Sequence, residues 1–216
     1  MRKETKNGIL NPEASKKLNV NNRIKIMKKI FLIIASVVIS TFYKGQEYPL
    51  NTGVYDIPNN AYLKDTNNEL DKYVGVWKGE WNGKTLYLDL RKIKTYSKGN
   101  LHSYYKDEIL GERKIIGANG TVEVDRISNF DTESPEFSGI FRSLKNANWK
   151  RIYFYPKDMC NKSASLDITS FTGTQMTLHF EYEPSFVDPT CKHNAYVDQY
   201  GEFPVNFPKD IVLTKQ

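Results

Sequence analysis

Hydrophobic and polar residues alternate along most of the chain after residue 75, and a period of two residues is typical of β-strands with one buried face. The segment Lys84–Tyr96 shows the pattern most clearly, because Leu86, Leu88 and Leu90 share one face and more polar side chains occupy the other. No helix-length stretch with a period of 3.6 residues separates such segments. The pattern therefore predicts an all-β domain.

Ten segments have the length and composition of strands. They are Gly75–Trp81, Lys84–Tyr96, His102–Leu110, Arg113–Ile116, Thr121–Ile127, Phe137–Ser143, Trp149–Tyr155, Ser165–Phe171, Met176–Tyr182 and Phe207–Leu213. Short turns separate most of them. The strongest turn signal is Asn82-Gly83, since both residues tolerate the positive φ that a two-residue type I′ hairpin requires.

Short connections favour antiparallel neighbours, because parallel strands need crossover connections of a dozen or more residues. We therefore expect an antiparallel meander of about 8–10 strands that closes as a lipocalin-like barrel. A β-sandwich is the alternative that the same pattern allows.

The N-terminal segment has the organisation of a signal peptide helix. Met27-Lys28-Lys29 supplies a basic start, and Ile30–Ile39 is an apolar run shorter than the roughly 20 residues of a membrane span. A polar stretch follows and predicts cleavage near Gly45–Gln46, with an uncleaved N-terminal anchor as the alternative. We therefore expect an exported bacterial protein, either periplasmic or extracellular.

Four regions follow from this organisation. Residues 1–26 are polar without a periodic apolar face, so we interpret them as a leader from a start site assigned too early, or as a disordered extension. Residues 27–45 form the predicted signal peptide, and residues 46–74 form an irregular lead-in segment. Residues 75–216 form a single all-β domain.

The basic net charge belongs to the targeting segment. Of the 31 Lys and Arg residues ten lie in residues 1–45, against two of the 25 Asp and Glu residues, so the remainder carries 21 basic and 23 acidic side chains. Composition thus gives no support for nucleic-acid binding, and we expect none. Membrane contact is expected only through the signal peptide before its cleavage.

The two cysteines predict a disulfide. Cys160 precedes Ser165–Phe171 and Cys191 follows Met176–Tyr182, so both lie at the open end of one predicted hairpin. Exported proteins usually oxidise cysteines placed in this way. The alternative is a metal site of Cys160, Cys191 and His193, which matches no standard zinc spacing.

Motifs for catalysis, metal binding or cofactor binding are absent from the sequence, including the nucleophile elbow, the P-loop and the dinucleotide fingerprint. We therefore expect no catalytic residues, no metal and no cofactor. His179, Glu181 and Glu183 alternate on one strand face and are weak candidates for acid–base or metal chemistry. The competing interpretation is the solvated outer face of a strand whose other face is core.

Aromatic residues are frequent, with 14 Tyr, 11 Phe and 3 Trp, which is enough to build either a ligand pocket or an aromatic core. Aromatic rings can also form carbohydrate platforms, and strand pairs favour them in ordinary packing. The candidates for the pocket or core are Trp77, Trp81, Trp149, Phe154, Phe180 and Tyr182.

One resemblance concerns the start of the β-domain. The segment Leu70–Trp77, with its Gly75-x-Trp77 pair, resembles the opening of lipocalin-like barrels. It implies an up-and-down barrel of about eight strands with an apolar cavity. An Arg on the last strand usually packs over the Trp in these barrels, and the predicted last strand, Phe207–Leu213, offers only Lys209 in that role.

A second resemblance covers the exported chain from Met27-Lys28-Lys29-Ile30 through Trp77–Trp81 to Pro208–Leu213. It is similar to a family of small exported proteins of flavobacterial type, described only as a domain of unknown function. The resemblance implies export and a β-rich single domain, and it carries no activity, ligand or catalytic residue.

The leading functional hypothesis is a non-catalytic exported β-barrel that binds a small apolar or aromatic ligand. The alternative is a cell-envelope protein that acts as an interaction or structural module, with contacts made by the loops Ser128–Glu136 and Pro184–Asn206. A hydrolase is the second alternative. The expected partner is accordingly a small apolar ligand or an envelope protein.

Overall fold

The computed structural model describes residues 25, 27–31, 46–99, 102–157, 160, 163–182, 189–201 and 203–216, with only the backbone of Tyr182. The chain divides into two units, Met1–Gln46 and Glu47–Gln216. In the first unit residues 27–31 are helical, and most of the predicted signal peptide lies outside the described residues. Within the described ranges, no helix has the length and apolar character to cross a membrane.

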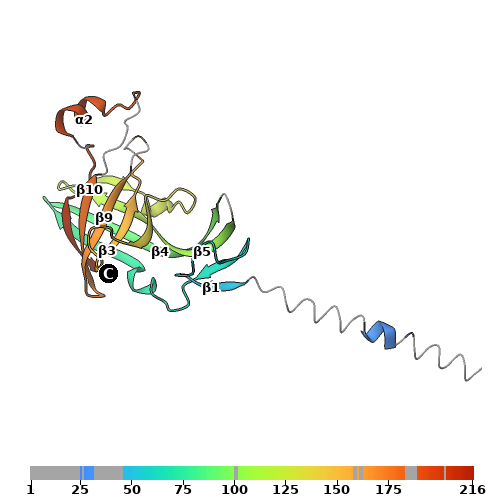
Figure 1. Ribbon diagram of the computed structural model, residues 1–216. Helices are drawn as coiled ribbons and strands as arrows, with labels where there is room; N and C mark the ends of the chain where they lie inside the picture. The colour runs from blue at the N-terminus through green and yellow to red at the C-terminus, as the bar shows by residue number, and fades with distance from the viewer. Residues whose placement is uncertain are drawn as a thin grey trace, which may run out of the picture. The chain divides into compact units, whose positions relative to one another are not determined.

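Eight antiparallel strands of the second unit close into a β-barrel (Figure 1). In chain order they are β3 (Gly75–Trp81), β4 (Lys84–Lys98), β5 (Ser103–Ile116), β7 (Phe137–Arg142), β8 (Lys150–Phe154), β9 (Ala164–Phe171), β10 (Gln175–Tyr182) and β11 (Asp210–Lys215). Each strand pairs with the next, and β11 pairs with β3 to close the circle. The predicted all-β meander is confirmed, and it closes as the expected barrel and not as the alternative sandwich.

The first hairpin follows directly from its turn residues. Asn82 has a φ of 47° and Gly83 a φ of 75°, so both central residues adopt the positive φ of a type I′ turn. The resulting register pairs Trp77 with Leu88. Because side chains alternate across a strand, this register points Trp77, Leu86 and Leu88 toward the barrel interior, where all three are fully buried.

The strand β5 corrects one prediction, which placed a break between Leu110 and Arg113. The strand runs unbroken for 14 residues. Gly111 serves close packing here instead of a turn, because a Cβ at this position would lie 2.6 Å from Cδ2 of Leu90. The expected strand Thr121–Ile127 is shorter than predicted: β6 (Val122–Asp125) pairs with β5 outside the barrel path, and η2 (Ile127–Asn129) follows it.

The lead-in segment is more regular than the sequence suggested. The strands β1 (Glu47–Pro49) and β2 (Tyr62–Lys64) pair in parallel, and β2 pairs in parallel with β5. Asp107 of β5 fixes this attachment, since it accepts hydrogen bonds from the Tyr62 hydroxyl (2.5 Å) and the Asp65 backbone N–H (2.9 Å). Burial and this carboxylate raise the pKa of Tyr62 to about 12.

The inward-pointing side chains pack against one another to form the main hydrophobic core. Every barrel strand contributes to it, so the core occupies the barrel interior. Its most deeply buried apolar members are Trp77, Leu86, Leu88, Leu90, Ile109, Ile115, Phe137, Ile152, Phe154, Ala164, Leu166 and Leu213. Burial of apolar area on this scale is the main source of the domain's stability.

The short helix η1 (Asp71–Tyr73) packs against Trp77 at one end of the barrel core. The indole N–H of Trp77 donates to the Tyr73 carbonyl oxygen at 2.9 Å. Lys215, at the end of β11, places its Nζ 5.4 Å from the Trp77 ring centroid and 3.4 Å from the Lys72 carbonyl oxygen. The prediction that the last strand offers only Lys209 to pack over Trp77 was therefore wrong, because β11 extends to Lys215. A basic side chain over the Trp77 ring is consistent with the lipocalin-like resemblance.

Candidate ligand site at the barrel rim

Four phenylalanines form an aromatic cluster near the end of the barrel away from η1. The rings of Phe137 and Phe154 stack with centroids 4.4 Å apart, and the Phe207 ring lies 5.2 Å from that of Phe154. The Phe180 ring lies 6.0 Å from that of Phe207. Three of these residues come from β7, β8 and β10, whereas Phe207 comes from the connection that leads into β11.

A buried ion pair lies against the aromatic cluster. The Arg113 guanidinium packs 5.0 Å from the Phe154 ring centroid, and Arg113 Nε donates to Glu136 Oε2 at 2.9 Å. Arg113 Nη1 also donates to the Asn206 carbonyl oxygen at 2.9 Å. Both charged residues are 1% exposed. Removing either charge alone would leave the other buried without its main partner, which is costly.

Burial raises the pKa of the Glu136 carboxyl, even though the Arg113 guanidinium favours its charged form. A second arginine, Arg126, lies 3.9 Å from the same carboxylate and makes two hydrogen bonds to Glu112, at 2.8 and 3.1 Å. The two arginines therefore hold the end of the loop Ser128–Glu136 against β5.

The segment of residues 203–209, which we call the strap, crosses the rim beside the aromatic cluster. The Asn206 side chain accepts a hydrogen bond from Lys84 at 3.1 Å and donates one to Glu123 at 2.7 Å. At the other side of the strap, the Phe180 backbone N–H donates to the Lys209 carbonyl oxygen at 2.7 Å. The strap is thus attached to the barrel from both sides.

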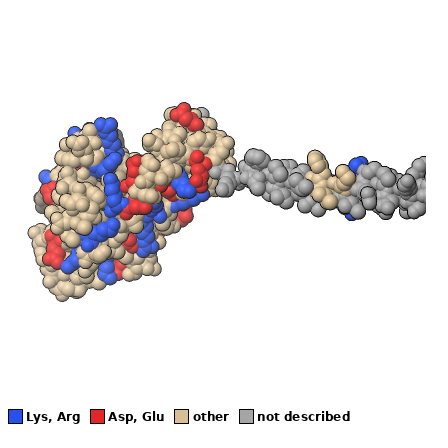
Figure 2. All heavy atoms as spheres, turned by 90° about the horizontal axis from the view of Figure 1, so that it is seen from below, with Lys and Arg blue, Asp and Glu red and all other residues tan. Residues whose placement is uncertain are grey.

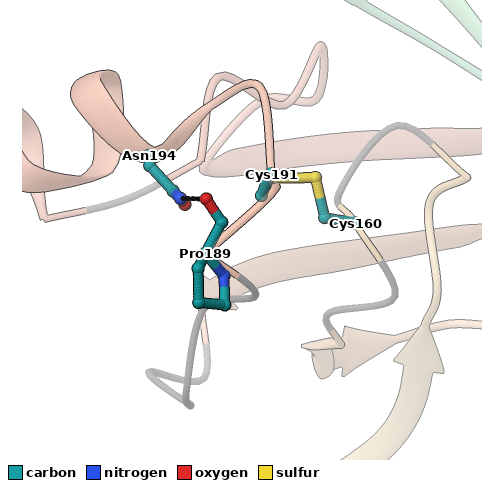
Figure 3. Close-up of a disulfide and its surroundings, with 4 residues drawn as sticks. All are labelled: Cys160, Pro189, Cys191 and Asn194. Carbon is teal, nitrogen blue, oxygen red and sulfur yellow. Dashed lines mark hydrogen bonds between the residues drawn. A yellow bond between two sulfur atoms is a disulfide. The ribbon is translucent and has the colours of Figure 1, made fainter.

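A disulfide between Cys160 and Cys191 tethers the chain that precedes the strap (Figure 3). The Cα atoms lie 5.9 Å apart, and the bridge confirms the predicted pairing. Between the bridge and the strap lies α2 (Asn194–Tyr200), whose Asn194 side chain donates to the Pro189 carbonyl oxygen at 3.0 Å. Cys191 packs against Phe203, so the bridge also supports the first residue of the strap.

A pocket of about 450 Å³, which we call the rim pocket, lies between the strap and β10. Four of its lining residues are apolar and three are polar or charged. They are Phe180, Phe203, Val205, Phe207, His179, Glu181 and Lys209. Phe180 and Phe207 also belong to the aromatic cluster, so the pocket wall continues the barrel core. The volume lies within the range of small-molecule sites, about 300–1,000 Å³.

Two polar groups of the rim pocket are held by neighbours outside it. His179 Nδ1 lies 2.6 Å from Asp210 Oδ1, and the Glu181 carboxylate forms an ion pair with Lys145. The exposed Lys209 side chain has no carboxylate partner in the described part of the chain. An anionic group bound in the pocket would therefore find a cation at its edge.

Two of the weak acid–base candidates of β10, His179 and Glu181, line the rim pocket together. His179 and Glu181 lie on the outer strand face, and each bonds to a different residue. Glu183 and the side chain of Tyr182 lie outside the described residues. Among the residues that the structure describes, no group of three His, Cys, Asp or Glu side chains could hold a metal ion.

The aromatic candidates separate into three places. Phe154 and Phe180 belong to the aromatic cluster, and Phe180 also lines the rim pocket. Trp77 is buried beside η1. Trp81 and Trp149 are half-buried and do not line the rim pocket. The candidates named from the sequence thus include two residues of the cluster, Phe154 and Phe180, and three residues of the pocket wall, Phe180, His179 and Glu181.

A sequence model described as a family of unknown function, DUF6705, matches residues 27–216. The chain belongs to this family. No curated protein and no solved structure matches it. The match begins at Met27 and includes every strand of the DUF6705 barrel.

The charged surface of this DUF6705 protein mixes both signs. In Figure 2, Lys and Arg side chains form a broken band on the face in view, and Asp and Glu side chains lie directly beside it. Opposite charges that lie close together weaken one another's field at a distance.

Sequence reasoning missed Arg113, Glu136 and the strap of the DUF6705 barrel. A signal for Arg113 was present, because it alternates in phase with Ile109 and Ile115 and therefore points inward from β5. Glu136 lies at the end of a predicted loop, so its position follows from tertiary contacts that no strand periodicity encodes. The strand predicted for Phe207–Leu213 begins only at Asp210, so Phe207 belongs to the strap.

Proposed function

We propose that this protein is an exported, non-catalytic binding protein whose small apolar or aromatic ligand occupies the rim pocket. The observation that carries the proposal is the composition of the pocket wall. Two phenylalanines of the barrel core, Phe180 and Phe207, reach this wall and are joined there by Phe203 and Val205. An apolar wall with a few polar groups at its edge is the usual form of a small-molecule site.

The charge distribution supports a ligand with a negatively charged end. Lys209 lies at the pocket edge and is exposed, whereas Glu181 is neutralised by Lys145. An aromatic or aliphatic carboxylate could place its apolar body against Phe203 and its carboxylate near Lys209. The apolar contacts would supply most of the affinity and the cation would orient the ligand.

Two further observations favour binding in an exported setting. The disulfide Cys160–Cys191 is of the kind that persists in oxidising compartments. The titratable pocket residues His179 and Glu181 are engaged in separate pairs, with Asp210 and Lys145. A catalytic acid and base would instead be expected to converge on one reacting atom.

A contact surface for an envelope protein is the second candidate function. The rings of Tyr196 and Tyr200 on α2 lie 4.5 Å apart, and both side chains are exposed. Exposed tyrosines are enriched at protein interfaces. Under this alternative the rim pocket is only a packing feature, so a ligand titration separates the two functions.

The titration uses 4-phenylbutyrate as the probe and follows backbone amide NMR signals. We expect saturable shifts centred on Phe203, Val205 and Lys209. The variant Val205→Phe fills the pocket and should weaken binding at least about tenfold, which corresponds to about 1.4 kcal/mol. Lys209→Gln should abolish the preference for 4-phenylbutyrate over the uncharged 4-phenylbutanol.

The matched control is Val122→Phe, which adds the same ring at an exposed position of β6. It should bind 4-phenylbutyrate as the parent protein does. Equal affinity in the Val205→Phe and Val122→Phe variants, or the absence of saturable shifts in the parent protein, would exclude the rim pocket as the ligand site.

A further inference from the structure

A larger concavity, which we call the outer groove, lies on the outside of the barrel. It has a volume of about 810 Å³ and is bordered by β4, β5, the loop 132–135 and residues 155–157. The strands β4 and β5 pair beyond Leu90, where β3 ends its pairing with β4, and together with β2 and β1 alongside β5 they form an extension of the barrel sheet. Thr95, Ser97 and Glu108 lie on the face of this extension that lines the groove.

A row of aromatic rings, Phe141, Tyr153 and Tyr155, which we call the aromatic row, leads to the outer groove. The ring centroids of Phe141 and Tyr153 lie 5.5 Å apart, and those of Tyr153 and Tyr155 lie 6.3 Å apart. Phe141 and Tyr155 are 41% and 43% exposed, and Tyr155 itself lines the groove. Aromatic rings on the outside of a barrel do not contribute to the buried core, so exposed rings that lie together indicate a binding surface.

The Phe141 ring, the first of the aromatic row, packs over Gly139. Gly139 has a φ of 76°, and the Phe141 ring lies where a side chain would otherwise stand, with its Cε2 1.8 Å from an ideal Cβ position. A Cβ at this position would therefore displace the ring. The bulge between Ser138 and Phe141 thus fixes the orientation of an exposed aromatic residue.

Polar groups in the outer groove offer both donors and acceptors. Glu108 accepts a hydrogen bond from the Thr95 hydroxyl at 3.2 Å and lies 3.0 Å from Lys106 Nζ. Lys157 bonds to the Ser134 hydroxyl on the opposite border. Hydroxyls therefore line the groove together with charges of both signs, from Lys94, Lys106, Lys157, Glu108 and Glu133.

We propose that the aromatic row and the outer groove bind a chain of neutral sugars. A pyranose ring has an apolar C–H face, which stacks on an aromatic ring, and a hydroxyl rim, which bonds to carboxylates, ammonium groups and hydroxyls. Neighbouring rings spaced 5.5 and 6.3 Å apart can contact successive sugar units of a polysaccharide. The near balance of charge favours a neutral chain over an acidic one.

This site is separate from the rim pocket, because the two share no lining residue. The glycan proposal therefore stands or falls independently of the proposed function. A protein partner fits the aromatic row less well, because interface cores are usually continuous and largely depleted of charged residues.

The test is affinity electrophoresis of the protein in gels that contain hydroxyethylcellulose, arabinoxylan, mixed-linkage β-glucan or galactomannan. We expect at least one of these polysaccharides to slow the protein. Tyr155→Ala and Phe141→Ala should each reduce the apparent association constant about tenfold. Thermal unfolding of each variant establishes that it is folded.

The matched control is Tyr196→Ala, which removes an exposed tyrosine of α2 that does not line the groove. It should be slowed as much as the parent protein, and so should Val205→Phe in the rim pocket. The proposal is overturned if no polysaccharide slows the parent protein, or if Tyr155→Ala and Tyr196→Ala are slowed equally.

Discussion

Replacing Arg113 with methionine is expected to lower the free energy of unfolding by about 3–5 kcal/mol at pH 8. The substitution leaves the Glu136 carboxylate buried without the guanidinium that bonds to it at 2.9 Å. It also removes the donor to the Asn206 carbonyl, which helps to hold the strap. Urea unfolding followed by tryptophan fluorescence measures the change.

The loss of unfolding free energy in the Arg113→Met variant should be smaller at acidic pH. Burial already raises the folded-state pKa of Glu136 above its ordinary value of 4.5, so a proton binds the folded protein more tightly than the unfolded chain. Stability contributed by such a group falls as the pH rises from about 4.5 through the folded pKa. Without Arg113 the folded pKa rises further, so the Arg113→Met deficit should be smaller at pH 5 than at pH 8.

The matched variant is Arg113→Met combined with Glu136→Leu, which removes both charges together. Replacing a buried ion pair with apolar residues is often neutral or stabilising, so the double variant should recover most of the lost stability. An equal loss in the single and double variants would show that the charge of Glu136 is not the cause.

Removing the disulfide by replacing Cys160 and Cys191 with serine should cost about 3–4 kcal/mol, because the bridge closes a loop of 31 residues in the unfolded chain. A second effect should appear at the rim pocket. Cys191 packs against Phe203, so 4-phenylbutyrate should bind less tightly to the serine variant.

Urea unfolding at pH 7 measures the first effect, and the NMR titration measures the second. The control variant is Ser163→Ala, which replaces a residue near Cys160 in the sequence. It should leave the free energy of unfolding and the affinity for 4-phenylbutyrate close to those of the parent protein. An unchanged unfolding midpoint in the serine variant would contradict the stabilising role of the bridge.

Much of the barrel could be predicted from alternation and turn chemistry. The strand Gly75–Trp81 was predicted with the bounds that β3 has, because alternation and the Asn82-Gly83 turn agree there. The disulfide was also predictable, since two cysteines flank one hairpin. These features depend on local sequence, and local and tertiary preferences coincide in them.

Other features were not predicted because they depend on contacts between segments that are distant in the sequence. Gly111 resembles a turn residue in the sequence, but it permits the close approach of Leu90 within an unbroken strand. The strands β1 and β2 are only three residues long, and Asp107 holds β2 from 45 residues away. A segment of three residues is too short for an alternation pattern to predict such a pairing.

The candidate site was only partly visible in the sequence. Phe180 was expected at a pocket or core because it alternates inward on β10, and it lines the rim pocket. Phe207 was predicted as the first residue of the last strand, in phase with the buried Ile211 and Leu213, although β11 begins only at Asp210. Phe203 and Val205 lie in an irregular segment, so strand periodicity could not assign them a face. The disulfide and the hydrogen bonds of Asn206 give that segment its position.

The central claim is that the rim pocket holds a small apolar or aromatic ligand. Native mass spectrometry of the protein, recovered after export by a bacterial host, tests it most directly. The account predicts an additional mass that is lost on denaturation and is missing from the Val205→Phe variant but present in Val122→Phe. A parent protein that carries only the mass of its processed chain would contradict the claim.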